Sequence, residues 1–485
     1  MVSTSSSSSS RRWRWWPWLP LTCFFLSLLS VASWKAVAAA GTTVTSLPGF
    51  DGPLPFSLET GYVEVNETTV VNLFYYFVYS ENDPDQDPLL VWLTGGPGCS
   101  SISGLAHEIG PFQFVAEWYN GREFPKLIYR PETWSKISNI IFVDSPVGAG
   151  FSYADTEEGS KSSDTKAVQE LLIFLRKWLL DHPQFLQNRL YIGGDSYGGI
   201  IVPTLTLAID ESNYLGEKPH LNLKGYIAGN PVTDPQFDED GKIPFLHGMG
   251  LISDELYKHA KETCRGKYSA TSNAQCAHSI QAINDKITDI STSKQCTKDI
   301  NMAHILEPIC QEIYSPMSHN TVARDGMSRL MLESAAADDD DDLNKASYVL
   351  LKIWANDETV RANLGNSWEW KRCNYDINYN KVIHSTVEYH LMLMRKGYRS
   401  IIYSGDHDGT ITFIGTQEWI RSMNLSIADD WRPWYVAGQV AGFTRSYASN
   451  NLTYATVKGA GHTAAEYKPK QCLKMFARWI SGNSL

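Results

Sequence analysis

Long runs of basic residues are missing from this 485-residue sequence beyond its first forty residues. Lysine and arginine together number 42, whereas aspartate and glutamate number 53, so the formal net charge is −11. This balance gives no electrostatic basis for binding a polyanion, and we expect no nucleic-acid partner. Hydrophobic residues make up 43% and charged residues 20% of the chain, a composition that predicts a globular protein rather than a disordered one.

The sequence also lacks the usual motifs of nucleotide and metal sites. Its glycine-rich stretch LLVWLTGGPGCSS (89–101) contains neither G-K-[ST] nor G-x-G-x-x-G, and none of its cysteine pairs has C-x-x-C spacing. Five consecutive aspartates stand at 338–342, without the glycine and spaced oxygen ligands of a calcium loop. We interpret 333–345 as a solvated acidic loop. We therefore expect neither a metal nor a cofactor.

After the first forty residues, no segment is apolar enough to span a bilayer. Residues 1–40 contain a serine run, three arginines, the fifteen-residue apolar stretch LPLTCFFLSLLSVAS and a small-residue A-x-A site at Ala38 and Ala40. This order is typical of a secretory signal peptide, whereas a membrane anchor needs roughly 20 apolar residues. We expect cleavage of 1–40, no membrane association afterwards, and a secreted or vacuolar location.

Sequons and cysteines agree with an oxidising secretory compartment. Three Asn-x-Ser/Thr triplets predict glycosylation at Asn66, Asn424 and Asn451. Seven cysteines follow the signal segment: Cys99, Cys264, Cys276, Cys296, Cys310, Cys373 and Cys472. Disulfides are the better interpretation of these cysteines in such a compartment. Because seven is odd, at least one thiol is free or pairs outside the chain.

Short apolar runs alternate with a helical pattern along the mature chain. The runs at 89–94, 139–144, 189–194, 224–229, 400–405 and 453–459 are predicted to be buried strands. Residues 165–180 carry apolar side chains at helical spacing. The alternation predicts an α/β fold with a mainly parallel sheet. Strand signals thin out between about 231 and 390, so we expect a helical insertion that caps the sheet within a single domain over 41–485.

A serine between glycines follows one predicted strand. Gly194-Asp195-Ser196-Tyr197-Gly198 fits G-x-S-x-G and precedes IIVPTLTLAI, a predicted helix. A strand-to-helix turn of this kind has no room for a Cβ at the glycines and holds the serine exposed. The helix N-terminus favours developing negative charge. The pattern also recurs in ordinary loops, so the prediction that Ser196 is a nucleophile depends on a partner base.

Two later strands end in residues that can activate a serine. Asp406-His407-Asp408-Gly409 follows the run at 400–405, and His462 follows the run at 453–459. A serine hydroxyl needs a base, the base needs an orienting carboxylate, and the chain order Ser, Asp, His is that of α/β-hydrolases. Taken singly, each aspartate could form a turn and the histidine could be a surface residue. Their order indicates a catalytic triad.

Backbone N–H groups should stabilise the oxyanion that such a triad generates. One expected donor is Tyr197, the residue after the nucleophile. The second is expected in the loop at 89–101, where Gly95 and Gly96 carry no side chain to block a substrate carbonyl.

Seven spaced motifs together resemble the plant serine carboxypeptidase-like proteins, from about residue 45 to the C-terminus. They are WLTGGPGCSS (92–101), DSPVGAGFSY (144–153), GGDSYGG (193–199), GNPVTD (229–234), HGMGLISDELY (247–257), YSGDHD (403–408) and GAGHTAAEYKP (459–469). The resemblance implies an α/β-hydrolase fold with a helical insertion, a triad of Ser196, Asp408 and His462, and an oxyanion hole formed by the N–H groups of Gly96 and Tyr197. It also implies three disulfides, Cys99–Cys373, Cys264–Cys276 and Cys296–Cys310, with Cys472 as the odd thiol. Some relatives are cut into two chains within the insertion, and the acidic loop is a plausible place for such a cut.

The resemblance leaves the reaction open, because the family contains peptidases and acyltransferases that share an acyl-serine intermediate. In the peptidases, an Asn before the two glycines and a Glu before the serine help to hold the substrate carboxylate. Here these positions carry Thr94 and Asp195, while a further family carboxylate is kept as Glu108. The carboxyl group of Asp lies one C–C bond, roughly 1.5 Å, closer to the backbone than that of Glu. Thr lacks the two N–H donors of the Asn amide.

These differences resemble the acyltransferase branch, which takes acyl groups from glucose esters of aromatic acids. We expect Thr94, Gly95, Glu108 and Asp195 to contact a small-molecule acyl donor, with an alcohol or amine as acceptor. The alternative is a serine carboxypeptidase that releases C-terminal residues from peptides. A third hypothesis is a binding protein that keeps only the fold.

Overall fold

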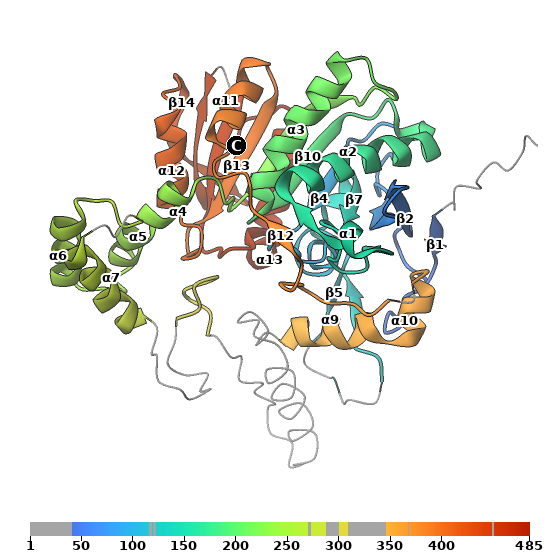
Figure 1. Cartoon of the computed structure of the whole chain (residues 1–485), viewed down its shortest axis with the longest axis horizontal. Helices are drawn as coiled ribbons and strands as arrows, with labels where there is room; N and C mark the ends of the chain where they lie inside the picture. Colours follow the sequence, from blue (N-terminus) through green and yellow to red (C-terminus); the bar gives the residue numbers. More distant parts are fainter. Residues whose placement is uncertain are drawn as a thin grey trace, which may run out of the picture. The chain divides into compact units, whose positions relative to one another are not determined.

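The computed structural model of the chain describes residues 41–115, 119, 123–269, 273–287, 300–308, 346–366, 368–448 and 451–485 (Figure 1). The predicted signal peptide (1–40), the acidic loop (333–345) and the cysteines of the predicted Cys296–Cys310 pair lie outside these residues. Gly41–Leu485 form one compact unit. Among the helices of the described part, none is long and apolar enough to cross a membrane.

Twelve strands of the described residues form one mixed sheet, in the order β1-β2-β3-β7-β4-β10-β11-β13-β16-β15-β14 with β8 beside β3. The central strands from β7 to β16 run parallel, whereas both edges of the sheet are antiparallel. The predicted α/β fold with a mainly parallel sheet is thus confirmed. The strands are β1 (Thr42–Val44), β2 (Leu58–Asn66), β3 (Val71–Val78), β4 (Leu89–Leu93), β7 (Asn139–Val143), β8 (Tyr153–Ala154), β10 (Leu190–Asp195), β11 (Leu223–Gly229), β13 (Arg399–Gly405), β14 (Ile427–Val436), β15 (Gln439–Tyr447) and β16 (Leu452–Val457).

Two short strand pairs lie outside this sheet. They are β5 (Phe112–Phe114) with β6 (Leu127–Tyr129), and β9 (Ser162–Ser163) with β12 (Tyr379–Asn380).

Helices connect most of the parallel strands. They are η1 (Gly104–Glu108), η3 (Trp134–Lys136), η4 (Pro183–Phe185), α1 (Glu157–Ser160), α2 (Asp164–Asp181), α3 (Gly198–Tyr214), α4 (Pro235–Asp240), α5 (Lys242–Gly248), α6 (Asp254–Cys264), α7 (Ala274–Ile287), α9 (Ala346–Asn356), α10 (Glu358–Asn363), α11 (Val387–Arg395), α12 (Phe413–Ser422), α13 (Ala464–Tyr467) and α14 (Pro469–Ile480). The helix predicted over 165–180 is α2, which begins at its N-cap Ser163, whose hydroxyl accepts a hydrogen bond from the Lys166 N–H. Between β11 and β13 the described elements are helices, apart from the two-residue β12.

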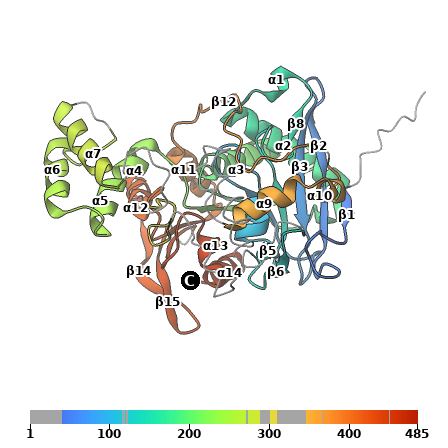
Figure 2. The ribbon, with the colours of Figure 1, turned by 90° about the horizontal axis from the view of Figure 1, so that it is seen from below.

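The central strands are buried on both faces because their side chains alternate between two apolar cores. On β4, Leu90 and Trp92 belong to one core and Val91 to the other, and Ile140 and Ile141 divide in the same way on β7. The first core contains residues of α9, α10 and α14, and the second contains residues of α2, α3, α11 and α12. Figure 2 shows α2 and α3 on one side of the sheet and α14 on the other. The continuous apolar runs in the sequence follow from this two-sided burial.

One carboxyl group is buried in α2 without a compensating hydrogen bond from the described residues. The Glu170 side chain is 5% exposed, neither oxygen accepts a hydrogen bond within the described part, and Lys166 Nζ lies 3.6 Å from Oε1. Burial raises the pKa of Glu170 to about 7, against a smaller lowering by the Lys166 charge.

Glu170→Gln should therefore change how stability depends on pH. The pKa of Glu170 is raised from 4.5 to about 7 in the folded state, so the buried side chain is protonated there and carries no ionisation penalty below pH 4.5. As the pH rises through about 7, the carboxyl ionises and the folded state loses stability. We expect the variant to gain on the order of 1–3 kcal/mol over the wild type at pH 8 and to lose this advantage near pH 4.5. Urea unfolding at both pH values measures the difference. The exposed Glu211→Gln on α3 is the control, and equal pH profiles for wild type and Glu170→Gln would contradict the prediction.

Candidate active site

Ser196 lies at the sharp turn between β10 and α3. Its φ angle is +52°, a left-handed conformation that is uncommon for a residue with a side chain. Its N–H donates to the Gly229 carbonyl (3.0 Å), and its carbonyl accepts from the N–H groups of Gly199 (2.9 Å) and Val232 (2.9 Å). These three bonds hold the strained conformation in place.

The glycines around Ser196 are required to different degrees. A Cβ on Gly194 would lie 2.4 Å from the Leu93 carbonyl oxygen, and one on Gly199 would lie 2.3 Å from that of Val232. At Gly198 the nearest atom, again the Leu93 oxygen, would be 3.1 Å away. The steric demand predicted for Gly194 and Gly198 therefore falls mainly on Gly194 and on Gly199, the next residue along.

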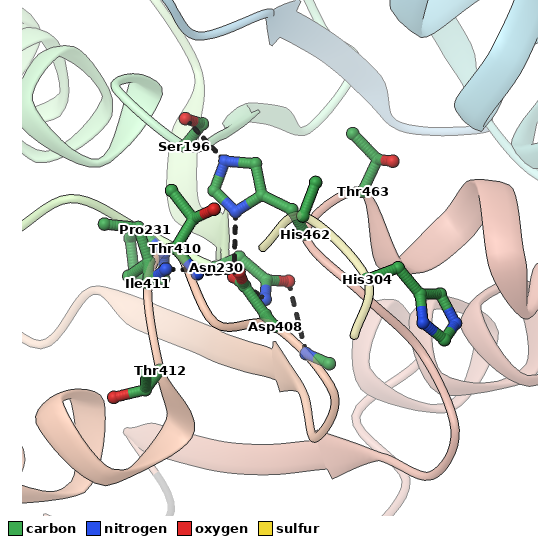
Figure 3. Close-up of polar contacts among 12 residues, drawn as sticks. Ser196, Asn230, Pro231, His304, Asp408, Thr410, Ile411, Thr412, His462 and Thr463 are labelled. Atoms are coloured by element: carbon green, nitrogen blue, oxygen red, sulfur yellow. Dashed lines mark hydrogen bonds and ion pairs between the residues drawn. The ribbon is translucent and has the colours of Figure 1, made fainter. Parts of the chain in front are cut away.

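Three loops bring a serine, a histidine and an aspartate together at the carboxyl ends of three parallel strands of the sheet (Figure 3). Ser196 follows β10, Asp408 follows β13 and His462 follows β16. His462 Nε2 lies 2.8 Å from Ser196 Oγ, and His462 Nδ1 lies 2.8 Å from Asp408 Oδ2. With its proton on Nδ1, the imidazole can accept the serine proton at Nε2.

The geometry distinguishes the two aspartates of the YSGDHD motif. Asp406 Oδ1 contacts His407 Nδ1 (2.6 Å) and accepts from the Gly459 N–H (2.6 Å), so it links the loops after β13 and β16. Asp408 is the residue that reaches His462.

The Asp408 carboxylate is fully buried and is surrounded by donors. Besides His462, it accepts hydrogen bonds from Asn230 Nδ2 (2.7 Å to Oδ2) and from the N–H groups of Thr410 (2.8 Å) and Ile411 (3.2 Å), both to Oδ1. Four donors compensate the loss of water around a buried charge. Sequence reasoning missed the role of Asn230, although its motif GNPVTD directly follows a predicted strand.

The predicted oxyanion loop lies against the nucleophile. A Cβ on Gly95 would lie 2.5 Å from Ser196 Cβ and 2.7 Å from the Tyr197 nitrogen, so only glycine allows this approach. Gly96 has a φ of +115°, which also favours glycine. Among the described residues, the N–H groups of Gly96 and Tyr197 find no backbone or side-chain acceptor. Both are therefore available to a substrate oxygen.

Covalent and polar contacts anchor this loop. The disulfide Cys99–Cys373 joins it to the segment after α10, and Asp144 Oδ1 accepts from Ser100 Oγ (2.7 Å) and from the Ser101 N–H (2.8 Å). The second disulfide of the described residues, Cys264–Cys276, joins α6 to α7, while Cys472 is free and buried.

Tyr197 is itself held by a buried carboxylate that sequence reasoning missed. Its hydroxyl donates to Asp164 Oδ1 (2.7 Å), which also accepts from the Tyr379 hydroxyl (2.8 Å). Tyr197 and Tyr379 line a small pocket together with Thr94, Gly95 and Ala167. No local sequence signal marks Asp164, because its partners lie 33 and 215 positions away.

Two further carboxyl groups lie beside the triad and are almost completely buried. Asp195 ends β10, and Glu108 ends the π-helical turn η1, where Trp92 Nε1 donates to its Oε2 (3.2 Å). Burial raises the pKa of both groups, and the charge of Asp195 raises that of Glu108 further. Asp195 Oδ1 and Thr94 Oγ1 are buried and accept no hydrogen bond from the described residues. Both oxygens are thus left without a hydrogen-bond partner inside the described part of the fold.

The three sequon asparagines lie apart from this site. Asn66 ends β2, Asn424 follows α12 and Asn451 precedes β16. Asn424 is exposed and the other two are partly exposed.

Comparison with known proteins identifies the family. The serine carboxypeptidase family matches residues 48–482. This chain belongs to that family. Serine carboxypeptidase-like 13 of Arabidopsis thaliana is 46% identical over 473 residues, which cover 96% of this chain and 100% of that protein. Serine carboxypeptidase-like 19 of the same plant is 45% identical over 477 residues, covering 96% and 99%.

A solved structure shows the same fold. Kex1(delta)p, a prohormone-processing carboxypeptidase of Saccharomyces cerevisiae, superposes with a TM-score of 0.70 at 19% identity, covering 90% of this chain and 95% of that one. The chain thus has the α/β-hydrolase fold of the serine carboxypeptidases, and the family makes it an enzyme of the hydrolase or acyltransferase type. Plant relatives and disulfides are consistent with the secretory pathway.

Asn230→Gly should lower turnover without unfolding the site. Glycine accepts the φ of +42° at this position. It removes the amide that donates to Asp408 (2.7 Å) and the longer bond that Asn230 Oδ1 accepts from the Gly405 N–H (3.3 Å). A hydrogen bond to a charged group is worth about 1.5–3 kcal/mol, so we expect kcat to fall about tenfold to a hundredfold. Asn230→Asp, which is isosteric but sets a second carboxylate against Asp408, should be more severe. Steady-state kinetics at constant folded fraction measure both variants, and wild-type turnover in Asn230→Asp would contradict the assignment.

Proposed function

We propose that this protein is an acyltransferase that moves an aromatic acyl group from a glucose ester to an alcohol or amine through an acyl-Ser196 intermediate. The observation that carries the mechanism is the unbroken line from Ser196 Oγ through the His462 imidazole to the buried Asp408. The third hypothesis, a binding protein that keeps only the fold, does not require this alignment.

The reaction follows from the positions of these groups. His462 Nε2 takes the proton of Ser196 Oγ as the oxygen attacks the ester carbonyl, and Asp408 stabilises the imidazolium. The negative charge that develops on the carbonyl oxygen is stabilised by the N–H groups of Gly96 and Tyr197. His462 then protonates the departing sugar oxygen, which leaves the acyl group on Ser196. The acceptor loses its proton to His462 and attacks the acyl carbonyl. As the bond to Ser196 Oγ breaks, His462 returns the proton to that oxygen and the product leaves.

Hydrogen-bond chemistry around Asp195 supports a sugar ester as donor. Asp195 Oδ1 is a buried acceptor and the Thr94 hydroxyl is a buried donor and acceptor, and neither has a partner among the described residues. A buried acceptor gains most from a ligand that brings a donor. A sugar hydroxyl donates, whereas the terminal carboxylate of a peptide only accepts and is repelled by an ionised Asp195.

One observation favours carboxypeptidase activity as the second candidate. Burial and the neighbouring charges of Asp195 and Glu466 raise the pKa of Glu108 well above its usual value. A protonated carboxyl group can donate to a substrate carboxylate, and this arrangement becomes more populated as the pH falls.

A donor-and-acceptor assay distinguishes the two activities. We expect the pure protein to consume a hydroxycinnamoyl glucose faster when alcohols or amines are present and to form the corresponding esters or amides. A blocked dipeptide should be hydrolysed slowly. Ser196→Ala is the control and should abolish both reactions. Rapid peptide hydrolysis without acyl transfer would overturn the transferase proposal in favour of the carboxypeptidase.

The residues beside the nucleophile should set the balance between the two reactions. Thr94→Asn with Asp195→Glu installs the pair found in the peptidases, lengthening the carboxyl by one bond and supplying an amide donor. We expect the ratio of peptide hydrolysis to acyl transfer to rise roughly tenfold, because substrate placement changes by about one bond length. Glu211→Gln, at an exposed position of α3 outside the site, is the control. An unchanged ratio in the double variant would show that these two positions do not select the substrate.

We also propose that 1–40 is removed as a signal peptide and that the single domain 41–485, with its helical insertion, is glycosylated and secreted or delivered to the vacuole. Intact-mass and N-terminal analysis of the protein from a plant host tests this. A mature chain that retains residues 1–40 and lacks glycans at Asn66, Asn424 and Asn451 would refute it.

A further inference from the structure

A short segment between β11 and β13, residues 300–308, runs along the loops that carry Asp408 and His462 (Figure 3). Its backbone makes three hydrogen bonds with them. The His462 N–H donates to the Ala303 carbonyl (2.6 Å), the Gly409 N–H donates to the Met302 carbonyl (2.8 Å), and the Ile305 N–H donates to the His407 carbonyl (3.1 Å). These bonds reach His462 itself and both chain neighbours of Asp408.

Two glycines of the catalytic loops leave room for this segment. A Cβ on Gly461 would lie 2.3 Å from the Ala303 oxygen and 2.6 Å from His304 Cβ, and a Cβ on Gly409 would lie 2.6 Å from Met302 Cε. Neither glycine has a positive φ, so backbone conformation does not require glycine there. The close approach of residues 302–304 therefore explains why both positions lack a side chain.

The His304 side chain attaches the segment to the chain that follows His462. It is 8% exposed, and its ring lies edge-on to the Tyr467 ring of α13 with 4.4 Å between centroids. Figure 3 shows the His304 ring turned away from Ser196, so it cannot serve as the base.

We propose that residues 302–305 form a positioning strap that sets the spacing of the Asp408 and His462 loops and thereby aligns His462 Nε2 on Ser196 Oγ. The inference rests on the proposed role of the triad. The strap acts through the backbones of the catalytic loops and does not touch the reacting atoms. A small misplacement of a catalytic group greatly lowers the reaction rate. A shift of the His462 backbone should therefore lower kcat strongly and change substrate affinity little.

Gly461→Ala tests the strap without substituting Ser196, Asp408 or His462. Its methyl group displaces the Ala303 carbonyl. We expect the rate constant of Ser196 labelling by a fluorophosphonate, measured per titrated active site, to fall roughly tenfold or more. KM for the acyl donor should change little. Gly248→Ala is the matched control, because a Cβ there meets no atom within 4 Å. A purely structural role would lower the fraction of labelled sites but not the rate constant per site.

A second pair of variants keeps the test decisive if Gly461→Ala does not fold. Gly409→Ala should slow labelling less than Gly461→Ala, because its Cβ meets Met302 Cε, the end of a flexible side chain that can shift at small cost. Adding Met302→Ala removes that atom and should restore the rate. Wild-type labelling rates in both glycine variants, or slow labelling that Met302→Ala does not restore, would overturn the strap. Failure of the wild-type protein to be labelled at Ser196 would instead refute the proposed function.

Discussion

The burial of the Asp408 carboxylate is the constraint on which the rest of this site depends. A carboxylate with no exposed surface needs hydrogen-bond donors, and this one receives them from Asn230 after β11, from its own loop after β13, and from His462 after β16. Satisfying one buried charge therefore brings three loops of the sheet to a common point. The imidazole that faces Ser196 is held from behind by the same carboxylate, so the alignment of the base follows from the burial of the acid.

The close approach of backbones sets the second requirement. The loop at Gly95 lies against Ser196, Gly194 and Gly199 allow the turn that carries the serine, and Gly461 allows residues 302–304 to reach His462. In each case the missing side chain makes room for a neighbouring carbonyl or nitrogen rather than for a substrate group. The glycines of the family motifs thus allow the loops around Ser196 and His462 to pack together, and the proposed oxyanion hole lies within that packing.

Two buried carboxyl groups near Ser196 form a separate electrostatic feature of the site. Asp195 and Glu108 lie next to the triad in surroundings poor in water, which raises the pKa of both. Such a pair shares protons over a pH range in which exposed carboxyls are ionised, so it can accept from a hydroxyl or donate to a carboxylate according to pH. In the proposed mechanism the triad serves an acyl-serine in either reaction, so we propose that these two side chains influence which substrate is used.

Periodicity predicted much of the fold. The buried parallel strands were identifiable as apolar runs, and the ends of the structural strands lie within two residues of the predicted ones. The β14–β15 hairpin was missed, because β14 is an edge strand that is mostly exposed or half-buried and therefore shows no apolar period. The G-x-S-x-G pattern predicts that Gly198 must lack a side chain, whereas in the structure this requirement falls on Gly199. The group that excludes a Cβ at Gly199 is the carbonyl of Val232, more than thirty residues along the chain, so no local pattern shows it.

The sequence by itself determined the glycine-rich turn at Ser196, the order of serine, aspartate and histidine, and the family. Each of these can be recognised from short motifs that follow predicted strands. The resemblance already implied Asp408, and the structure shows that this side chain contacts His462. Only the tertiary structure showed that Asn230 and Asp164 support the site and that residues 302–305 lie against the loops of Asp408 and His462. The physical reason is distance along the chain. Ser196 and His462 are 266 positions apart, and Asn230 and Asp408 are 178 apart. Local patterns record which element a residue belongs to, whereas hydrogen bonds between such distant loops exist only once the sheet has set its strands side by side.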